Sequence, residues 1–453
     1  MADARPFHWE FTPAPVAREV FRVEGGRPLR GRVSVSGSKN AALKLLAAAT
    51  LTGERCRFTN VPEIEDVRVM ADTLRDLGVV VDHPSPNVYE IAAGDVDWLF
   101  VPLEAAAKMR ASFILLGPLL ARFGRVIISN PGGDRIGRRP VNLHVEAMRA
   151  LGADIEYRNG YYFARSPGRL RGGPVTFPVV TVMGTENAIL AAALAEGTTR
   201  IRPAAQEPEV DDLIEFLRKM GADIEREAPD AVVVLGQRRL RGAEHHVVPD
   251  RIEAGTFAVA AAVTGGDVTI DGAPCDHLGA FLEVLDSVGV AVTRGPDTIE
   301  VRGAPPGSGV YRAVDIATGA YPGLATDLQP PTCVLLSQAA GTSRVHETIF
   351  EDRLEWLSEL ARMGADVKMA DARHATISGP APLHGAEVEI GDLRAGASLI
   401  LAALAARGTS TIHGAHHVLR GYENIERKFQ DLGAGVVRSP EAERLSGEDA
   451  PGS

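Results

Sequence analysis

The segment GSKNAALKLLAAATL, residues 37–51, joins a small-residue turn to a helix that has almost no polar face. Such a helix offers no side to water, so we expect it to be buried all round. Five more segments share its composition: SFILLGPLLARF (112–123), NAILAAALAEG (187–197), GTFAVAAAVTGG (255–266), TCVLLSQAAG (332–341) and ASLILAALAARG (397–408). The sequence therefore predicts a fold with six interior helices.

Each interior helix is followed by a short strand of alternating residues and then by an amphipathic helix that ends at a glycine. These closing glycines lie roughly 68 to 75 residues apart: Gly78, Gly152, Gly221, Gly289, Gly364 and Gly433. A regular period of this length indicates six duplicated α/β units. We expect the units to cluster three at a time, with helices inside and sheets outside, in two lobes separated by a ligand-binding cleft.

Composition narrows the class of protein. The 453 residues are 45% apolar and 24% charged, which is typical of a globular enzyme with two domains. A net charge of -11 argues against a nucleic-acid or anionic-membrane partner. We also expect a cytoplasmic protein, because the sequence has no leader-like segment and no apolar run of about 18 residues.

Three cysteines, Cys56, Cys275 and Cys333, are scattered without the spacing of metal ligands or of a disulfide framework. The motifs GxxxxGK[ST], GxGxxG and HExxH do not occur in the sequence. Their absence argues against a P-loop hydrolase, a Rossmann dehydrogenase and a zinc protease.

Polar residues recur in two slots of the repeat, each predicted at a helix N-terminus. The turn before the interior helix holds Lys39, Asn40, Arg110, Glu186, Asn187, Asp250, Arg251, Glu253, Asp327, Asp392 and Arg394. The slot after the short strand holds Asp66, PGGDRIGRRP (131–140), AAQEPE (204–209), Arg353 and Arg420.

Six cations in these slots favour a ligand that carries several negative charges: Lys39, Arg110, Arg139, Arg353, Arg394 and Arg420. Helix N-termini attract anions, and Arg or Lys adds charge-assisted hydrogen bonds to phosphate or carboxylate. For any single residue, a helix cap or an ordinary ion pair is an equally available explanation. Recurrence at matching slots favours the anion site, and PGGDRIGRRP is typical of a flexible cationic loop over such a ligand.

Ten motifs in this order resemble those of the UDP-N-acetylglucosamine enolpyruvyl transferase family, which belongs to the superfamily of the shikimate-pathway enolpyruvyl transferase. They are GSKNAALKLLAA, MRASFILLGPLLARFG, PGGDRIGRRPVNLH, GTENAILAA, EPEV, DRIEAGTF, TDLQP, FEDRL, DLRAGASL and RGYENIERK. The resemblance runs from about residue 21 to the end of the last repeat.

This resemblance implies an α/β fold of two inside-out, barrel-like lobes, each with three βαβαββ repeats. One lobe would comprise residues 39–248 and carry a mobile loop at 130–140. The catalytic lobe would comprise residues 249–440 and be completed by an N-terminal strand within 21–38. Residues 1–20 would form an extension and residues 441–453 a tail.

The family's activity implies transfer of the enolpyruvyl group of phosphoenolpyruvate to the 3-hydroxyl of UDP-N-acetylglucosamine, the first committed step of peptidoglycan synthesis. Both partners would be small molecules, and the protein would be a monomer or a weak homo-oligomer. By position, Lys39, Arg139 and Arg420 would clamp phosphoenolpyruvate, with Arg353 and Arg394 in support. The nucleotide sugar would contact Asn40, Arg110, Pro140, Val141, Asp327 and Ile349.

Proton transfer in this reaction needs one base and one acid, and the resemblance implies that neither a metal nor an organic cofactor is required. The resemblance assigns Asp327 as the base for the sugar hydroxyl and Asp134 as the acid, with Lys39 and Arg420 as further catalytic residues. Many relatives carry a cysteine at Asp134, the target of fosfomycin, so we expect insensitivity to that drug. Asp134 would need its pKa raised above about 3.9 to act as an acid at neutral pH.

Three departures fall on the nucleotide-sugar side: Glu65 where some relatives have lysine, Gln206 for arginine and Asn142 for aspartate. They leave open the alternative that the protein is a paralogous enolpyruvyl transferase that acts on another nucleotide such as UMP. A non-catalytic UDP-sugar binding protein and a relative of the RNA 3′-phosphate cyclases are alternatives of another class.

Overall fold

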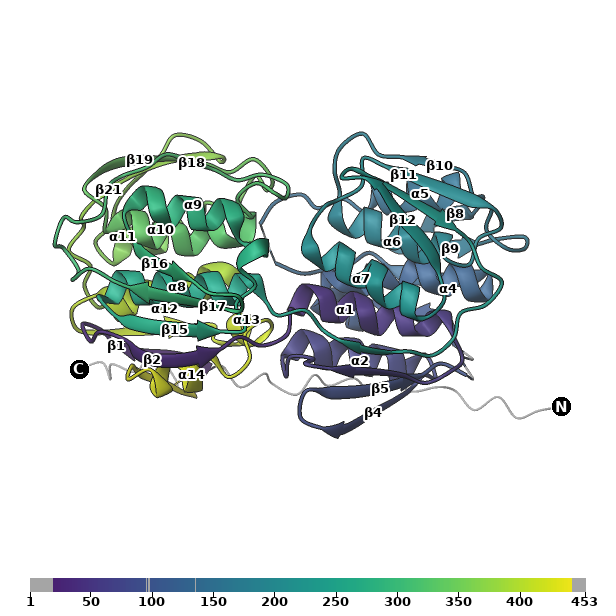
Figure 1. Ribbon diagram of the computed structural model, residues 1–453, viewed down its shortest axis with the longest axis horizontal. Coiled ribbons are helices and arrows are strands. Elements are labelled where there is room, and N and C mark those ends of the chain that lie inside the picture. The colour runs from purple at the N-terminus through teal and green to yellow at the C-terminus, as the bar shows by residue number, and fades with distance from the viewer. Residues whose placement is uncertain (1–18, 95, 97, 135, 442–453) are drawn as a thin grey trace, which may run out of the picture.

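The structure is a computed structural model that describes residues 19–94, 96, 98–134 and 136–441. Two lobes lie side by side along its longest axis (Figure 1). The first lobe has a hydrophobic core drawn from residues 41–247, and the second has one drawn from residues 21–33 and 252–436. Most of the predicted N-terminal extension and C-terminal tail lie outside the described residues.

Six interior helices form the centres of the lobes, three in each, as the small-residue segments predict. In α8 every residue from Arg251 to Thr264 is buried, and in α12 every residue from Leu393 to Ala405. Alanine-rich helices can approach each other closely, and α8, α10 and α12 pack directly together. The interior helices are α1 (Lys39–Ala48), α4 (Leu116–Phe123), α6 (Val182–Ala192), α8 (Arg251–Thr264), α10 (Gln329–Ser337) and α12 (Leu393–Ala405).

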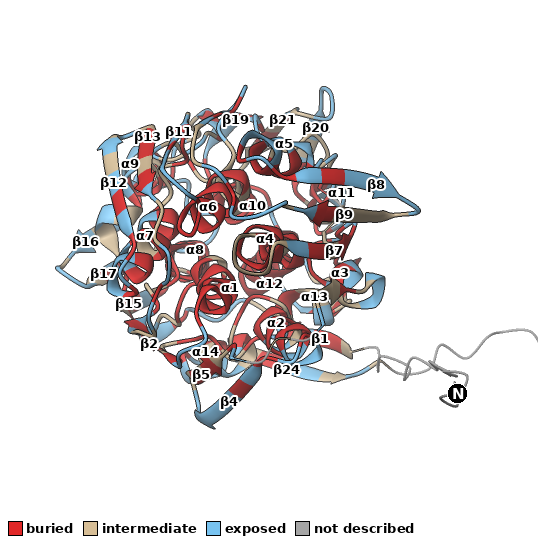
Figure 2. Ribbon diagram, turned by 90° about the vertical axis from the view of Figure 1, so that its right-hand side faces the viewer, coloured by how far each residue is buried: buried red, intermediate tan, exposed pale blue. Residues whose placement is uncertain are grey.

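Three four-stranded sheets surround the helices of the first lobe. Each sheet joins one parallel pair to two antiparallel pairs, and side chains facing the helices are buried while the opposite face is largely exposed (Figure 2). In spatial order the sheets are β14 (Glu244–His246), β3 (Cys56–Thr59), β5 (Val88–Ala92) and β4 (Val80–Ser85); β6 (Phe100–Val101), β7 (Arg125–Ser129), β9 (Tyr161–Arg165) and β8 (Asp154–Arg158); β10 (Pro174–Thr176), β11 (Thr198–Arg202), β13 (Ala231–Leu235) and β12 (Asp223–Ala228).

The second lobe repeats this arrangement with three sheets of the same pattern. They are β2 (Arg30–Ser34), β15 (Asp267–Asp271), β17 (Thr298–Arg302) and β16 (Ala291–Arg294); β18 (Ile316–Ala317), β19 (Gly341–His346), β21 (His374–Gly379) and β20 (Asp366–Met369); β22 (Glu387–Glu389), β23 (Thr409–His413), β1 (Glu19–Glu24) and β24 (Gly435–Pro440). Two inside-out α/β lobes are thus the fold class that the repeats and the resemblance predict.

Amphipathic helices complete the six units and end at the glycines expected from the sequence. All six closing glycines have φ between 90° and 100°, the left-handed region that favours glycine. The helices are α2 (Glu65–Asp76), α5 (Asn142–Ala150), α7 (Pro208–Lys219), α9 (Gly279–Val288), α11 (Leu357–Arg362) and α14 (Ile425–Asp431).

Shorter helical segments complete the description: α3 (Leu103–Lys108), α13 (His416–Leu419), and the 3-10 turns η1 (Ala49–Leu51), η2 (Arg110–Leu115), η3 (Cys275–His277) and η4 (Thr326–Leu328). The predicted helix 112–123 begins as the 3-10 turn η2 and becomes α-helical only at Leu116. No helix in the described ranges is long and apolar enough to cross a membrane.

Two linkers, residues 35–38 and 247–250, carry the chain between the lobes and run antiparallel beside each other. The Ser38 amide donates to the Val248 carbonyl (2.7 Å), and the Asp250 amide donates to the Ser36 carbonyl (2.8 Å). A Cβ at Gly37 would lie 1.7 Å from the Asn60 carbonyl oxygen, so no larger residue fits there without movement of the backbone. This double crossing holds the start of α1 against the start of α8.

The N-terminal strand β1 is a structural part of the second lobe. It lies between β23 and β24, pairs with both, and begins at Glu19, slightly before the predicted lobe boundary at residue 21. Phe21 is fully buried in the second core, while Arg22 is exposed on the other face of the strand. A strand from the start of the sequence therefore lies inside a sheet whose other three strands come from the end of the sequence.

We expect Phe21→Ala to destabilise the second lobe by about 3–5 kcal/mol, because the change leaves a cavity in its core. Denaturant unfolding followed by fluorescence would measure the effect. Arg22→Ala is the matched control and should change stability by no more than about 0.5 kcal/mol. Equal stability of Phe21→Ala and wild type would contradict a structural role for β1.

Candidate active site

Helix N-termini from both lobes meet at the linkers, and the predicted site residues gather around this junction. Asp250 caps α8 by accepting from the amides of Ile252 and Glu253, and it also accepts from the Lys39 amide at the start of α1 (3.2 Å). Asp392 caps α12 in the same way. A helix cap was one of the explanations that the sequence allowed for these residues, and the structure shows that both aspartates are caps.

Lys39 and Arg420, which come from different lobes, bind one carboxylate. The Lys39 Nζ lies 2.7 Å from Asp66 Oδ2, and the Arg420 Nε donates to Asp66 Oδ1 at 3.0 Å. The Asp66 side chain is 3% exposed. Asp66 therefore offsets the repulsion between two cations brought together from positions far apart in the chain.

Asp134 forms a second carboxylate contact across the lobes, because its Oδ1 accepts from Arg420 Nη1. Burial alone raises the pKa of Asp134, but Arg420, Lys39 and Arg139 outweigh this effect and hold the pKa below its ordinary value. The raised pKa that an acid at neutral pH requires is therefore not present in this arrangement. The reason is that three cations face Asp134, which the local sequence does not reveal.

Asp327 pairs with two arginines of its own lobe, Arg353 (3.0 Å) and Arg394 (3.1 Å). Burial raises the pKa of Asp327, but the two arginines together with Lys39 lower it far below its ordinary value. Both arginines keep a buried donor without a hydrogen-bond partner, Arg353 Nε and Arg394 Nη1. Such donors favour an additional anion at this point.

Arg110 and Arg139 are the two cations of the site that stand outside its direct ion pairs. Burial and the neighbouring Arg139 lower the pKa of Arg110 to about 10. Burial also lowers the pKa of Arg139, although Asp134 and Asp327 act in the opposite direction. Neither guanidinium makes an ion pair within the described part of the chain. Arg139 instead lies over the Phe350 ring, 5.4 Å from its centroid, as does Arg353 at 5.8 Å.

The loop that precedes α5 docks on the second lobe beside Phe350. The Arg138 amide donates to Glu351 Oε1 (2.8 Å), and the Asp352 amide donates to the Ile136 carbonyl (3.3 Å). Pro140 and Val141 end this loop, where Pro140 is exposed and Val141 is buried, and Ile349 on the second lobe is exposed. Asn40 follows Lys39 in α1 and is half-buried.

Two sequence expectations about local placement are wrong. Glu186 lies inside α6, whose first residue is Val182, where it is buried 3.5 Å from Lys44. Its pKa is raised to about 7, chiefly by burial. Arg420 lies at the C-terminal end of α13, not at a helix N-terminus. In short or all-apolar segments the residue pattern gives little indication of where a helix begins or ends. Periodicity therefore could not predict the place of Glu186 or Arg420 in its helix.

Sequence reasoning missed the role of Asp66 and the presence of His417. Asp66 occupies the second slot but was not assigned to the site, although its position at the start of α2 was the available signal. Burial and the adjacent His416 lower the pKa of His417 to about 4, and it lies near Asp134 and Arg420. The motif spacing gave no signal for His417.

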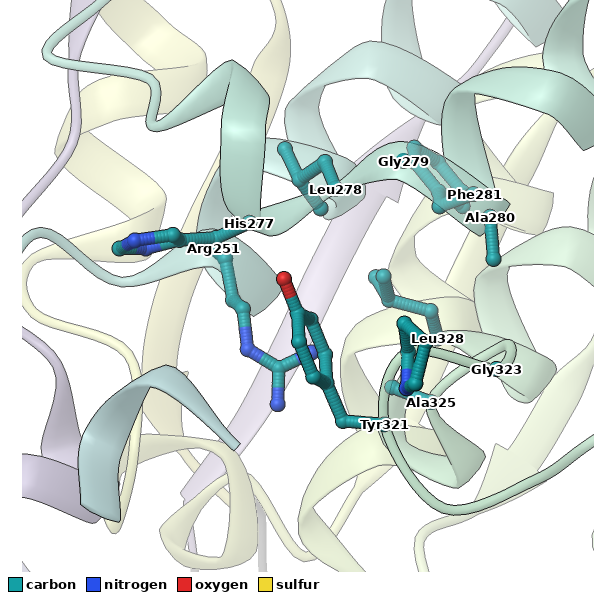
Figure 3. A pocket seen from close by; sticks show the side chains of 11 residues that line it. Arg251, His277, Leu278, Gly279, Ala280, Phe281, Tyr321, Gly323, Ala325 and Leu328 are labelled. Atoms are coloured by element: carbon teal, nitrogen blue, oxygen red, sulfur yellow. The ribbon is translucent and has the colours of Figure 1, made fainter. Parts of the chain in front are cut away.

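Another buried pair joins the lobes at their junction: Arg251 of α8 donates to Glu209 of α7 at 3.0 and 3.3 Å. The Tyr321 ring lies over Arg251, and the Tyr321 amide donates to Glu207. The small cavity beside them is shown in Figure 3, lined by Arg251, His277, Tyr321 and Leu328 among others. Its free volume of about 10 Å³ has room for one water molecule and not for a substrate.

Within the described ranges, no group of three or more His, Cys, Asp or Glu residues could hold a metal ion. What the junction offers is charge: five arginines and a lysine lie between the two lobes, and three carboxylates, Asp66, Asp134 and Asp327, pair with four of these six cations. An α/β protein of two inside-out lobes with this site is suited to bind a small ligand that carries several negative charges.

Comparison with known proteins defines the family. The sequence profile of EPSP synthase (3-phosphoshikimate 1-carboxyvinyltransferase) matches residues 23–429. The chain belongs to this family of carboxyvinyl transferases, as its motifs predict.

Two relatives carry the name UDP-N-acetylglucosamine 1-carboxyvinyltransferase. The protein from Solibacter usitatus (strain Ellin6076) is 46% identical over 92% of this chain and 99% of its own length. The protein from Gluconobacter oxydans (strain 621H) is 44% identical over the same shares.

Solved structures agree with the fold. The enolpyruvyl transferase NikO from Streptomyces tendae matches with a TM-score of 0.85 at 25% identity, over 94% of this chain and 100% of that one. EPSP synthase from Acinetobacter baumannii matches with a TM-score of 0.73 at 20% identity, over 93% and 100% of the two chains, which supports the fold alone.

We expect Glu209→Ala to destabilise the protein by about 3 kcal/mol, because it leaves the buried Arg251 without its carboxylate. Denaturant unfolding would measure the loss. Glu215→Ala on the same helix removes an exposed pair with Lys219 and should cost no more than about 1 kcal/mol. If the two variants were equally stable, the Arg251 pair would not hold the lobes together.

Proposed function

We propose that this chain transfers the enolpyruvyl group of phosphoenolpyruvate to the 3-hydroxyl of UDP-N-acetylglucosamine and releases phosphate. The observation that carries the proposal is the set of cations that both lobes direct at the junction, two of which, Arg110 and Arg139, form no direct ion pair with a carboxylate among the described residues. The names of the relatives at 44–46% identity support the acceptor. We also propose that the reaction occurs in the cytoplasm, as the first committed step of peptidoglycan synthesis, in a monomer or weak homo-oligomer.

In this proposal Lys39, Arg139 and Arg420 hold the phosphate and carboxylate of phosphoenolpyruvate. Arg353 and Arg394 add the buried donors that have no hydrogen-bond partner in the described part of the chain. Charge-assisted bonds between guanidinium groups and these oxyanions are strong in a site shielded from water. The nucleotide sugar lies against Asn40, Arg110, Pro140, Val141 and Ile349, on the side where the loop before α5 meets the second lobe.

Asp327 acts as the base for the sugar 3-hydroxyl, whose oxygen attacks C2 while C3 gains a proton. The low pKa of Asp327 keeps it ionised and therefore able to accept a proton at any physiological pH. A carboxylate held between two arginines is a weak base, so its basicity must rise during the reaction. An incoming anion that shares Arg353 and Arg394 has this effect, because it reduces the positive charge acting on Asp327.

The test of the proposal is phosphate release from phosphoenolpyruvate with UDP-N-acetylglucosamine, UMP or shikimate 3-phosphate as acceptor. Release with UDP-N-acetylglucosamine alone is the expected result. Release with UMP alone would contradict the acceptor and favour a paralogue, for which the departures at Glu65, Gln206 and Asn142 would be the determinants. If none of the three acceptors supports phosphate release, a non-catalytic UDP-sugar binding protein is favoured instead.

We expect Asp327→Asn to lower turnover at least about a hundredfold, since it removes the general base. Binding of phosphoenolpyruvate should be retained, because the change removes a negative charge from beside two arginines. Steady-state kinetics and a binding titration would separate the two effects. Asp371→Asn, at an exposed pair with His374 on the same lobe, is the control. Near-normal turnover of Asp327→Asn would exclude it as the base.

We expect the wild type to resist inactivation by fosfomycin, because a carboxylate at position 134 replaces the thiolate nucleophile that the epoxide alkylates. Asp134→Cys should restore time-dependent inactivation. Residual activity after incubation with the drug measures both. Rapid inactivation of the wild type would show that another residue reacts.

A further inference from the structure

We propose that phosphoenolpyruvate displaces Asp134 from Arg420, and that Asp134 takes up a proton from solvent as the ion pair breaks. Binding of the anionic substrate would thereby prepare the acid that the reaction needs. The inference rests on the proposed function and goes beyond it, because it assigns the free protein an internal competitor for its own substrate.

The competition follows from the carboxylates already bound to Arg420. Its Nε and Nη2 donate to the two oxygens of Asp66, at 3.0 and 3.4 Å, and its Nη1 donates to Asp134. Three of the five N–H groups of the guanidinium thus have a carboxylate partner, and each Nη keeps one further N–H. An oxyanion of the substrate bound to either remaining N–H would lie beside a carboxylate on the same nitrogen, so charge repulsion favours the departure of one carboxylate.

Asp134 is the carboxylate that is free to move. Asp66 is anchored in α2, is 3% exposed and is held by Lys39 in addition to Arg420. Asp134 makes a single side-chain hydrogen bond, is 15% exposed and follows Gly133, whose φ is 113°. The one-bond contact on a glycine-containing loop breaks at lower cost than the anchored contact in a helix.

Proton uptake follows from the groups that face Asp134. Arg420, Lys39 and Arg139 lower its pKa, and they outweigh burial, which raises it. Asp392 and His417 also lie near enough to interact with it, and Asp66 shares Arg420. When the substrate takes over Arg420 and Arg139, Asp134 loses its counter-charges and gains a neighbouring anion, while it remains partly buried.

The proton balance closes within one turnover. Solvent supplies one proton to the Asp134 carboxylate on binding, and the O–H bond breaks when C3 of the enol accepts that proton, while the sugar hydroxyl gives its proton to Asp327. In the elimination a C3–H bond breaks and returns a proton to Asp134, and the C2–O bond to phosphate breaks as the phosphate takes the proton held by Asp327. Asp134 then releases its proton to solvent and can return to Arg420 after phosphate leaves. No oxidant or metal is needed.

Calorimetric titration with phosphoenolpyruvate tests the inference, with full-length wild type and Asp134→Asn, each in two buffers of different ionisation enthalpy from pH 5.5 to 8. Protons taken up or released by phosphoenolpyruvate itself are the same for both proteins, so they cancel when the proton counts of the wild type and Asp134→Asn are compared. We expect the wild type to take up close to one more proton than Asp134→Asn near pH 5.5. At pH 8 Asp134→Asn should bind at least about threefold more tightly, since no ion pair must break. The difference between the affinities of the wild type and Asp134→Asn for phosphoenolpyruvate should become smaller as the pH falls.

Asp315→Asn is the control, because it removes an exposed carboxylate paired with Arg344 far from the junction. It should match the wild type in proton count and affinity. Asp134→Ser gives a second neutral side chain in case Asp134→Asn folds poorly. Equal proton counts and affinities for the wild type and a folded Asp134 variant would overturn the inference and leave the proposed function intact. Failure of every variant and the wild type to bind phosphoenolpyruvate would overturn both.

Discussion

The structure depends on the balance of charge at the junction of the two lobes. Lys39 and Arg420 arrive from different lobes and would repel each other without Asp66, which binds both and is almost completely buried. Asp327 plays the same part for Arg353 and Arg394. Arg110 and Arg139 make no direct ion pair among the described residues, so they are available with the other cations of the junction to bind an anionic ligand.

The inside-out architecture makes this concentration of charge possible. Helices that are buried on all sides carry few charged residues along their length, and the buried pair of Lys44 and Glu186 is an exception, so most charged side chains collect at their ends. Lys39 and Arg394 lie in the first turns of α1 and α12, and Asp250 and Asp392 cap α8 and α12. Favourable helix dipoles and free amide groups at these ends also attract anions. The same alanine-rich sequence that builds the core thus directs functional residues to the junction.

Much of this organisation could be predicted from the sequence. The six interior segments, the closing glycines with positive φ and the position of Lys39 at a helix start all follow from local patterns. What could not be predicted depends on contacts between distant repeats. Asp66 and Arg420 are 354 positions apart, and no local signal pairs them. The lowered pKa of Asp134 likewise results from three cations supplied by three different repeats.

We propose that this junction adds a hydroxyl to C2 and a proton to C3 of one bound phosphoenolpyruvate, and that phosphate and a proton from C3 are then lost. Nuclear magnetic resonance of the products formed from phosphoenolpyruvate and UDP-N-acetylglucosamine in D₂O distinguishes this route. We expect an enolpyruvyl ether on the sugar 3-oxygen with deuterium in its methylene group. A product without deuterium at C3, or an ether on another oxygen, would contradict it.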